Sequence, residues 1–334
     1  MNNIKKIGLS ALAGSLVAFS ANAAELSVSG GVEITYVDTG GNKGNEVTGN
    51  SFGANNGVTF KGSGDVLGGT FSMTRAINDT NTGWGSAFQT LDMGDMGIFS
   101  FDSTAGALVG LTANDDLLPT AYEESWTGVS TSKIGGVGST NVIGYRNTVA
   151  GVSLSAGYSN SVGSAQQGES SSSGTANNAS HGSVYDVYVS TSALEGLTIG
   201  AGFSVNTSTN KTGEANADTK ENIMQATYAM GPVAVGYKMA QINTGTAATA
   251  STAVDGFSIA FNVNDNFAVS YGQQDAELES IAGSTAVTEE STGFSAAYTI
   301  GAASIRFNHS ESSNDGNVTG TEDETTELGL ALSF

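Results

Sequence analysis

The side chains that usually perform catalysis or bind metal ions are scarce in this chain. It contains two histidines, His181 and His309, and no cysteine. Neither histidine has a second ligand at the spacing of a zinc site, and without cysteine there can be no thiolate ligand or disulfide. Serine is so abundant that the presence of serine and histidine together is no evidence for a catalytic pair. We therefore expect no enzyme, no catalytic residues, no bound metal and no cofactor.

Charge is the second chemical property to consider, and it is strongly one-sided. The 334 residues include 32 acids and 11 lysines or arginines, for a formal net charge of −21, and charged residues make up only 13% of the chain. Nucleic-acid binding depends on neutralising phosphates, so we expect no nucleic-acid partner. The 46 glycines come with only 2 prolines, which excludes collagen, and 14 Phe with 10 Tyr argue against simple disorder. This composition is typical of an all-β protein with many turns.

The first 23 residues have the features of a secretory signal peptide. Lys5 and Lys6 form a basic start, residues 7–19 are apolar, and Ala21-Asn22-Ala23 is a small-x-small cleavage site. The alternative, a helical membrane anchor, is disfavoured because this apolar stretch is too short to span a bilayer. Cleavage before Ala24 would leave a single domain at 24–334, and the loss of two lysines would take its net charge to −23.

After the signal peptide, the apolar residues recur with a period of two. Near the C-terminus, Leu328, Leu330, Leu332 and Phe334 alternate with Gly329, Ala331 and Ser333. The same alternation recurs throughout the domain, with Ser, Thr, Gly, Ala or Asn between the apolar residues. Helical spacing explains none of these windows, so we expect β-strands with one apolar and one small or polar face.

The connections between these strands alternate in length. Seven short turns and eight long polar segments make fifteen connections and therefore predict sixteen strands. We expect them near 25–38, 51–63, 67–77, 86–93, 97–103, 139–147, 151–160, 183–192, 196–205, 221–230, 232–241, 254–263, 266–275, 291–299, 302–310 and 326–334.

A sheet of sixteen strands cannot remain open, because its two edges would expose unpaired backbone groups. Closure into a barrel removes the edges, and lipid can cover the apolar outer face. An even strand number, short turns at one rim, long loops at the other and a polar lumen are typical of outer-membrane barrels. A soluble β-sandwich or a β-solenoid adhesin is the alternative fold. The expected fold class is all-β, a 16-stranded antiparallel transmembrane β-barrel in the Gram-negative outer membrane.

Several short segments resemble the general porins of Gram-negative bacteria, which are sixteen-stranded trimeric diffusion channels. The resemblance covers the whole domain in pattern and shorter pieces in sequence. These pieces are Phe60-Lys61-Gly62-Ser63 with Asp65 and Gly68-Gly69, Leu118-Pro119 with Thr120-Ala121-Tyr122, Gly135-Gly136-Val137, Tyr145-Arg146-Asn147 and the terminal Phe334. The resemblance implies a third extracellular loop, here about 104–138, that folds inward and narrows the barrel.

In such channels, acids on the inward loop face bases on the wall, and the resulting field sorts solutes. The candidate loop acids are Asp115, Asp116, Glu123 and Glu124. Side-chain alternation places four bases on the lumen face of their strands, namely Lys61, Arg146, Lys238 and Arg306. It also places three acids on that face, Glu33, Asp102 and Asp186. The alternative is that these charges are merely solvated in a wet lumen.

The chain departs from the porin pattern mainly by having fewer basic residues. Gly57 and Asp102-Ser103 stand where the family often has arginine, and Thr120-Ala121-Tyr122 replaces the acids that usually follow the loop proline. We therefore expect a passive diffusion pore that favours cations. Two alternatives are a substrate-specific channel, for example for phosphate or another anion, and a non-conducting adhesive barrel whose loop at 160–182 binds a ligand. The expected partners are outer-membrane lipid and lipopolysaccharide, two further copies in a homotrimer, and the barrel-assembly machinery through Phe334.

Overall fold

The computed structural model describes residues 25–42, 49–78, 84–104, 109–114, 116–129, 134–138, 140–160, 182–207, 218–244, 251–279 and 286–334. The predicted signal peptide, Asp115, His181 and most of the segment 160–182 lie outside the described residues.

The described chain forms sixteen strands, as the alternation of short and long connections predicts. Their bounds are β1 Glu25–Gly41, β2 Phe52–Val66, β3 Gly69–Asn78, β4 Trp84–Asp92, β5 Ile98–Thr104, β6 Val142–Val149, β7 Val152–Ser159, β8 Val184–Leu194, β9 Leu197–Asn206, β10 Thr219–Met230, β11 Val233–Asn243, β12 Thr252–Asn264, β13 Phe267–Leu278, β14 Val287–Ile300, β15 Ala303–Ser313 and β16 Glu322–Ser333. Two short 3-10 turns, η1 at Gly94–Met96 and η2 at Asp315–Asn317, lie between strands. No helix in these ranges is long and apolar enough to cross a membrane.

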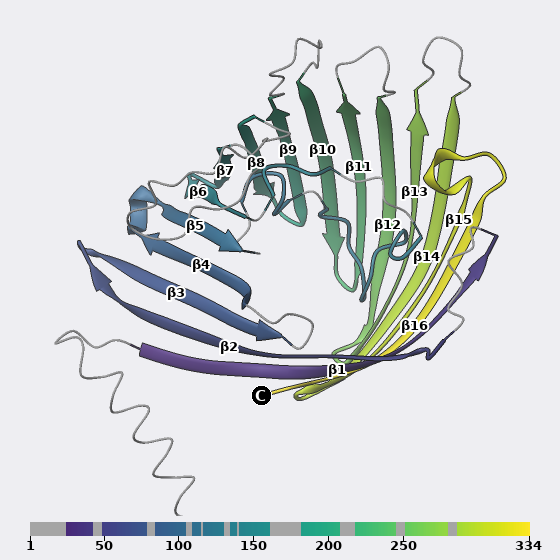
Figure 1. Cartoon of the computed structure of the whole chain (residues 1–334), viewed down its shortest axis with the longest axis horizontal. Helices are drawn as coiled ribbons and strands as arrows, with labels where there is room; N and C mark the ends of the chain where they lie inside the picture. Colours follow the sequence, from purple (N-terminus) through teal and green to yellow (C-terminus); the bar gives the residue numbers. More distant parts are fainter. Residues whose placement is uncertain are drawn as a thin grey trace, which may run out of the picture.

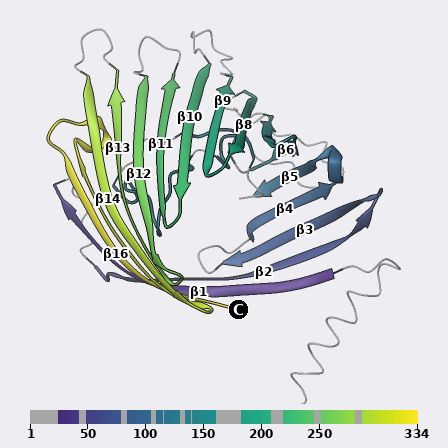
Figure 2. The same cartoon turned by 180° about the vertical axis from the view of Figure 1, so that it is seen from behind.

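The sixteen strands close into one antiparallel barrel. Each strand pairs with its neighbours in the chain, and β1 pairs with β16 from Gly31 opposite Ser333 to Gly41 opposite Asp323. Figure 1 shows the sheet curving from the purple β1 to the yellow β16, and Figure 2 shows the same closure from behind. The expected fold class is therefore confirmed, and closure leaves no sheet edge unpaired.

The two faces of the barrel differ as the period of two predicts. Large apolar side chains are exposed on the outside, for example Met224, Tyr237 and Phe257, whereas the buried wall positions inside are mostly small and polar, such as Ser204, Ser270 and Ser295. This arrangement is the reverse of a soluble protein and places the apolar face against lipid.

Several strands extend further than the sequence pattern predicts, mostly at the end that carries the long loops. β14 begins at Val287 instead of 291, and β16 begins at Glu322 instead of 326. The additional residues are largely Glu, Thr and Ser, which continue the backbone ladder beyond the apolar band, as in Glu290 opposite Ser313. Backbone pairing does not require apolar side chains, so the apolar alternation ends before the strand does.

Candidate functional site

The long connection between β5 and β6 returns into the barrel. Its described parts contact side chains on the inner face of strands from β7 to β16. Figure 1 shows this teal segment crossing the concave side of β8 to β12. Apolar packing seats the base of the segment, which we call the inner loop, because Val109 and Val137 are buried against Val142 of β6 and Val184 of β8. A second cluster packs Leu111 and Ile134 against Ile223.

A buried carboxylate holds both arms of the inner loop. Asp186 Oδ2 on β8 accepts the backbone N–H of Leu111 at 3.0 Å from the outgoing arm and that of Val137 at 2.8 Å from the returning arm. Gly110 and Gly136 have positive φ and pass so close that a Cβ on either would collide with Asp186. Glycine at these two positions therefore allows the backbone to approach the carboxylate.

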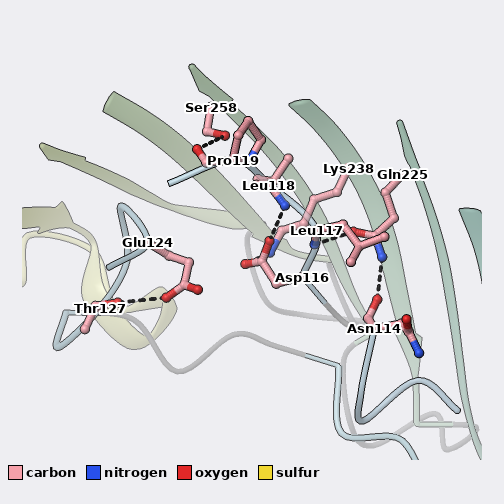
Figure 3. Close-up of polar contacts among 10 residues, drawn as sticks. All are labelled: Asn114, Asp116, Leu117, Leu118, Pro119, Glu124, Thr127, Gln225, Lys238 and Ser258. Carbon is pink, nitrogen blue, oxygen red and sulfur yellow. Dashed lines mark hydrogen bonds and ion pairs between the residues drawn. The ribbon is translucent and has the colours of Figure 1, made fainter. Parts of the chain in front are cut away.

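The middle of the inner loop is held by an ion pair and an amide (Figure 3). Lys238 Nζ on β11 lies 3.2 Å from Asp116 Oδ2 and 3.7 Å from the centre of the Trp126 ring, so it combines an ion pair with a cation–π contact. Gln225 Oε1 on β10 accepts from Leu117 N–H at 3.0 Å, and its Nε2 donates to the Asn114 carbonyl. These contacts fix the loop segment before Pro119 against the wall.

Beyond the proline, the inner loop reaches the far wall through Tyr122. The Tyr122 hydroxyl donates to Glu327 of β16 at 2.6 Å, and Arg306 Nη1 of β15 binds Glu33 Oε1 of β1 at 2.8 Å. The Arg306 guanidinium lies 5.1 Å from the Tyr122 ring centre. The Tyr122 backbone N–H donates to Ser295 Oγ at 3.1 Å. Side chains from β1, β14, β15 and β16 therefore meet the loop at one point.

The protein environment changes the acidity of three loop groups. Burial raises the pKa of the Asp116 carboxyl above its ordinary value, and Lys238 opposes this only in part. Burial and the Glu124 carboxylate raise the pKa of Glu123. Burial and the hydrogen bond to Glu327 raise the pKa of the Tyr122 hydroxyl, so this group remains protonated and acts as a donor.

The comparisons with known proteins agree with this geometry. Residues 8–302 match the model of the Gram-negative porin family. The chain belongs to this family. No curated protein sequence matches it. The porin is thus an outer-membrane β-barrel channel, and its family consists of channels, not enzymes.

Solved structures with the same barrel are distant in sequence. The anion-selective porin from Comamonas acidovorans is 15% identical, with a TM-score of 0.66 over 93% of this chain and 100% of that one. Salmonella typhi OmpF, solved with daunomycin, is 14% identical, with a TM-score of 0.63 over 92% and 97%. OmpT, an outer membrane protein of Vibrio cholerae, is 13% identical, with a TM-score of 0.64 over 95% and 99%. At these identities the likeness shows the fold alone.

The structure brings most of the predicted site residues of the porin together, but in two separate groups. Asp116 lies with Lys238, while Arg306 lies with Glu33 and near Tyr122, the residue that precedes Glu123. Glu124 accepts from the Thr127 hydroxyl within the inner loop. All of these groups lie along the loop and the wall that it contacts.

Two predicted bases lie apart from these groups. Lys61 is exposed on β2 opposite Ser27 and Thr74, and Arg146 lies on β6 opposite Ser155. Arg146 and Asn114 line the same cavity near the short-turn rim. Neither base pairs with an acid in the ion pairs found among the described residues.

Two of the predicted pore-lining acids are not exposed to the channel, contrary to expectation. Asp102 and Asp186 have the expected inward orientation, but their exposed fractions are 0% and 1%. Side-chain alternation identifies the inward face correctly and cannot show that a loop later covers it. The inner loop packs over Asp186 and uses it as a hydrogen-bond acceptor.

Several contributors to this site were absent from the sequence prediction. Trp126 of the loop is one of them, and its ring contacts Lys238 of the wall. Gln225 carries no charge, so a search for charged residues on the inward face did not identify it. Glu327 has the same inward parity as Gly329 and Ala331, so alternation alone could have identified it. Within the described residues, no cluster of acids and histidines is arranged to hold a metal ion.

Proposed function

We propose that this porin forms a water-filled pore for passive diffusion of small hydrophilic solutes and ions, and that it favours cations. One observation supports the proposed preference for cations. Both bases that contact the inner loop or its anchoring point, Lys238 and Arg306, are paired with acids. By contrast, Glu123, Glu124 and Glu327 have hydroxyl partners and no lysine or arginine partner among the described residues.

This excess of carboxylates has a direct physical effect. Fixed negative charge along a narrow aqueous passage raises the local cation concentration and repels anions. The fold does not determine this property, because the same barrel is found in the anion-selective porin of Comamonas acidovorans. Selectivity is therefore set by the side chains along the passage, and the pore width by the inner loop.

Charge removal at the inner loop tests this proposal. We expect the triple variant Glu123→Gln, Glu124→Gln, Glu327→Gln to lower the cation-to-anion permeability ratio by about threefold or more, because it removes the excess carboxylates. The ratio is measured as a reversal potential of single channels in a planar bilayer under a KCl gradient. An unchanged reversal potential would refute the role of these acids.

A matched control removes the same charge outside the pore. Glu290, Glu311 and Glu324 are exposed on the outward parity of β14, β15 and β16. The triple Gln variant at these positions should leave the permeability ratio of the pore unchanged.

The same recordings of the unaltered porin test the two alternative functions. Block of the current by one solute at low concentration would indicate a substrate-specific channel. A folded barrel that inserts and never conducts would indicate an adhesive one.

The selectivity should also depend on pH. Because Glu123 has a raised pKa, it takes up a proton at a higher pH than an ordinary glutamate at 4.5. Protonation of Asp116, whose pKa is also raised, removes the negative partner of Lys238. We therefore expect cation preference to begin to fall above pH 4.5 as the solution is acidified, measured as reversal potential against pH. Glu123→Gln should shift this transition to lower pH.

The raised pKa values of Glu123 and Asp116 affect the stability of the fold in the opposite direction to the selectivity. A carboxyl whose pKa is raised in the folded state binds its proton more tightly there than in the unfolded chain. Protonation of Glu123 and Asp116 therefore removes an unfavourable contribution to folding as the pH falls. The porin should lose cation preference in this pH window with no loss of thermal stability caused by these two groups.

We further propose that the porin assembles as a homotrimer, contacts lipopolysaccharide, and is recognised by the barrel-assembly machinery through Phe334. The resemblance to the general porins, which are trimeric channels, supports self-association. The Phe334 amide donates to the Gly30 carbonyl at 2.9 Å, while 78% of the residue remains exposed. Such a C-terminal aromatic residue at the end of the last strand is accessible to a receptor.

A further inference from the structure

The connection between β15 and β16 turns back across the wall of the barrel before it continues into β16. We call residues 314–321 of this connection, which include η2, the mouth loop. It contacts β14 and reaches β13. Figures 1 and 2 both show this yellow segment lying across β14. Because neighbouring strands are about 4.8 Å apart, the mouth loop extends roughly 10 Å along the wall from the strand that it leaves.

Two asparagine side chains fasten the mouth loop to the wall. Asn317 Nδ2 donates to the Ala276 carbonyl of β13 at 2.7 Å and to the Val287 carbonyl of β14 at 3.1 Å. Asn314 Nδ2 donates to the Thr288 carbonyl of β14 at 3.0 Å. Both asparagines have positive φ, a conformation that asparagine adopts more readily than most residues. The loop therefore has a defined shape and its own contacts with two strands.

Glu289 shows that these contacts lie on the inner side of the wall. It has the same parity along β14 as Ser295, which accepts from the inner loop, and its Oε2 accepts from the Gly316 N–H at 2.8 Å. Glu289 is 0% exposed, and Ala276, which lies opposite it on β13, is 1% exposed. By contrast, Asn55 has inward parity on β2 and is exposed. The mouth loop thus covers part of the inner face at the end of the barrel that carries the long loops.

The mouth loop lies close to the returning part of the inner loop. Ser312 of β15, just before the mouth loop, donates from its Oγ to the Val129 carbonyl at 3.1 Å. Thr325 of β16, just after the mouth loop, has its Oγ1 3.5 Å from the Gly128 carbonyl. Two loops from distant parts of the sequence therefore cover the inner face of β13 to β16. A solute that enters from the long-loop end meets the mouth loop as well as the inner loop.

We infer that the mouth loop is a second constriction, which limits the size of solutes entering from the long-loop end, and that Asn314 and Asn317 position it. The inference rests on the proposed diffusion function. A loop hydrogen-bonded to the inner wall occupies space that water and solutes would otherwise fill. Its single charged residue, Asp315, is 2% exposed, whereas the exposed Val318 and Thr319 are neutral. The mouth loop therefore selects by size, and the carboxylates near the inner loop select by charge.

Polymer exclusion from single channels tests this inference. The double variant Asn314→Gly, Asn317→Gly removes the side-chain hydrogen bonds to the wall and keeps positive φ accessible. Polyethylene glycols of increasing mass are added to one side of the bilayer at a time, and entry is measured as a fall in conductance. We expect the variant to admit larger polymers from the long-loop side, with an unchanged cut-off from the short-turn side and an unchanged reversal potential. An unchanged cut-off from the long-loop side, or an equal shift from both sides, would overturn the inference.

A control and a second variant make the result specific. Thr319→Gly adds the same flexibility to the mouth loop, and the Thr319 side chain has no part in the described hydrogen bonds to the wall, so the cut-off should stay unchanged. Deletion of residues 315–320 joins Asn314 to Thr321 as a two-residue turn between the paired Ser313 and Glu322. This variant should shift the cut-off at least as far as the double variant. A conducting porin with an unchanged cut-off after this deletion would refute the second constriction alone, whereas a folded barrel that never conducts would refute the diffusion function.

Discussion

Asp186→Ala should release both arms of the inner loop at once and produce the largest change in channel behaviour of any single substitution in the wall. The carboxylate accepts from Leu111 and Val137, and its loss leaves two buried N–H groups without their acceptor. Such a loss costs roughly 1–3 kcal/mol for each group. Because about 1.4 kcal/mol corresponds to tenfold in an equilibrium, closures of the pore should become at least about tenfold more frequent. The measurement is open-channel noise and voltage-dependent closure in single-channel recordings.

Two comparisons separate loop positioning from a direct charge effect. Asp186→Asn retains an acceptor oxygen and should give a smaller increase in closures than Asp186→Ala. Glu221→Gln affects the returning arm alone, through Gly135 and Gly136, and should also have a smaller effect. If both Asp186 variants shifted the reversal potential equally and left the noise unchanged, the residue would act as a pore charge and not as a clamp.

Lys238→Met should strongly destabilise the barrel and its inner loop. Lys238 is 5% exposed and forms its ion pair with Asp116 beneath the loop. Removal of one member of a buried pair leaves an uncompensated charge, which typically lowers the free energy of unfolding by about 3–5 kcal/mol. We expect a lower temperature for the heat-induced mobility shift on gels, together with a noisier channel.

The double variant Lys238→Met, Asp116→Asn makes this prediction specific. It removes the unpaired acid, so its stability should recover part of the loss, and the difference gives the coupling between the two residues. Lys61→Met is the matched control, since Lys61 is an exposed lysine on the same inward face. A loss of stability at Lys61 equal to that at Lys238 would contradict a special role for the buried pair.

Much of the fold could be predicted because a barrel wall has the simplest possible pattern. Each residue faces either lipid or lumen, so alternation alone identified the inward orientation of Lys238 and Arg306. Strand ends were less predictable, because Glu322 continues the backbone ladder where apolar alternation has already stopped. The inward course of the loop was implied by the resemblance to the general porins and not by side-chain alternation.

The contacts of the inner loop could not be predicted, because they join residues that are far apart in sequence. No local signal indicates that Asp186 would receive the arms of the loop, or that Tyr122 would reach Glu327.

The seam between β1 and β16 has a consequence for the timing of assembly. The free edge of β1, the first strand to be synthesised, gains its backbone hydrogen bonds only when β16, the last strand of the barrel, has been made. Until β16 arrives, every intermediate is an open sheet with two reactive edges, and a chain that stops early remains in that state. Any component that binds β16 therefore binds only chains in which all sixteen strands of the barrel have been made.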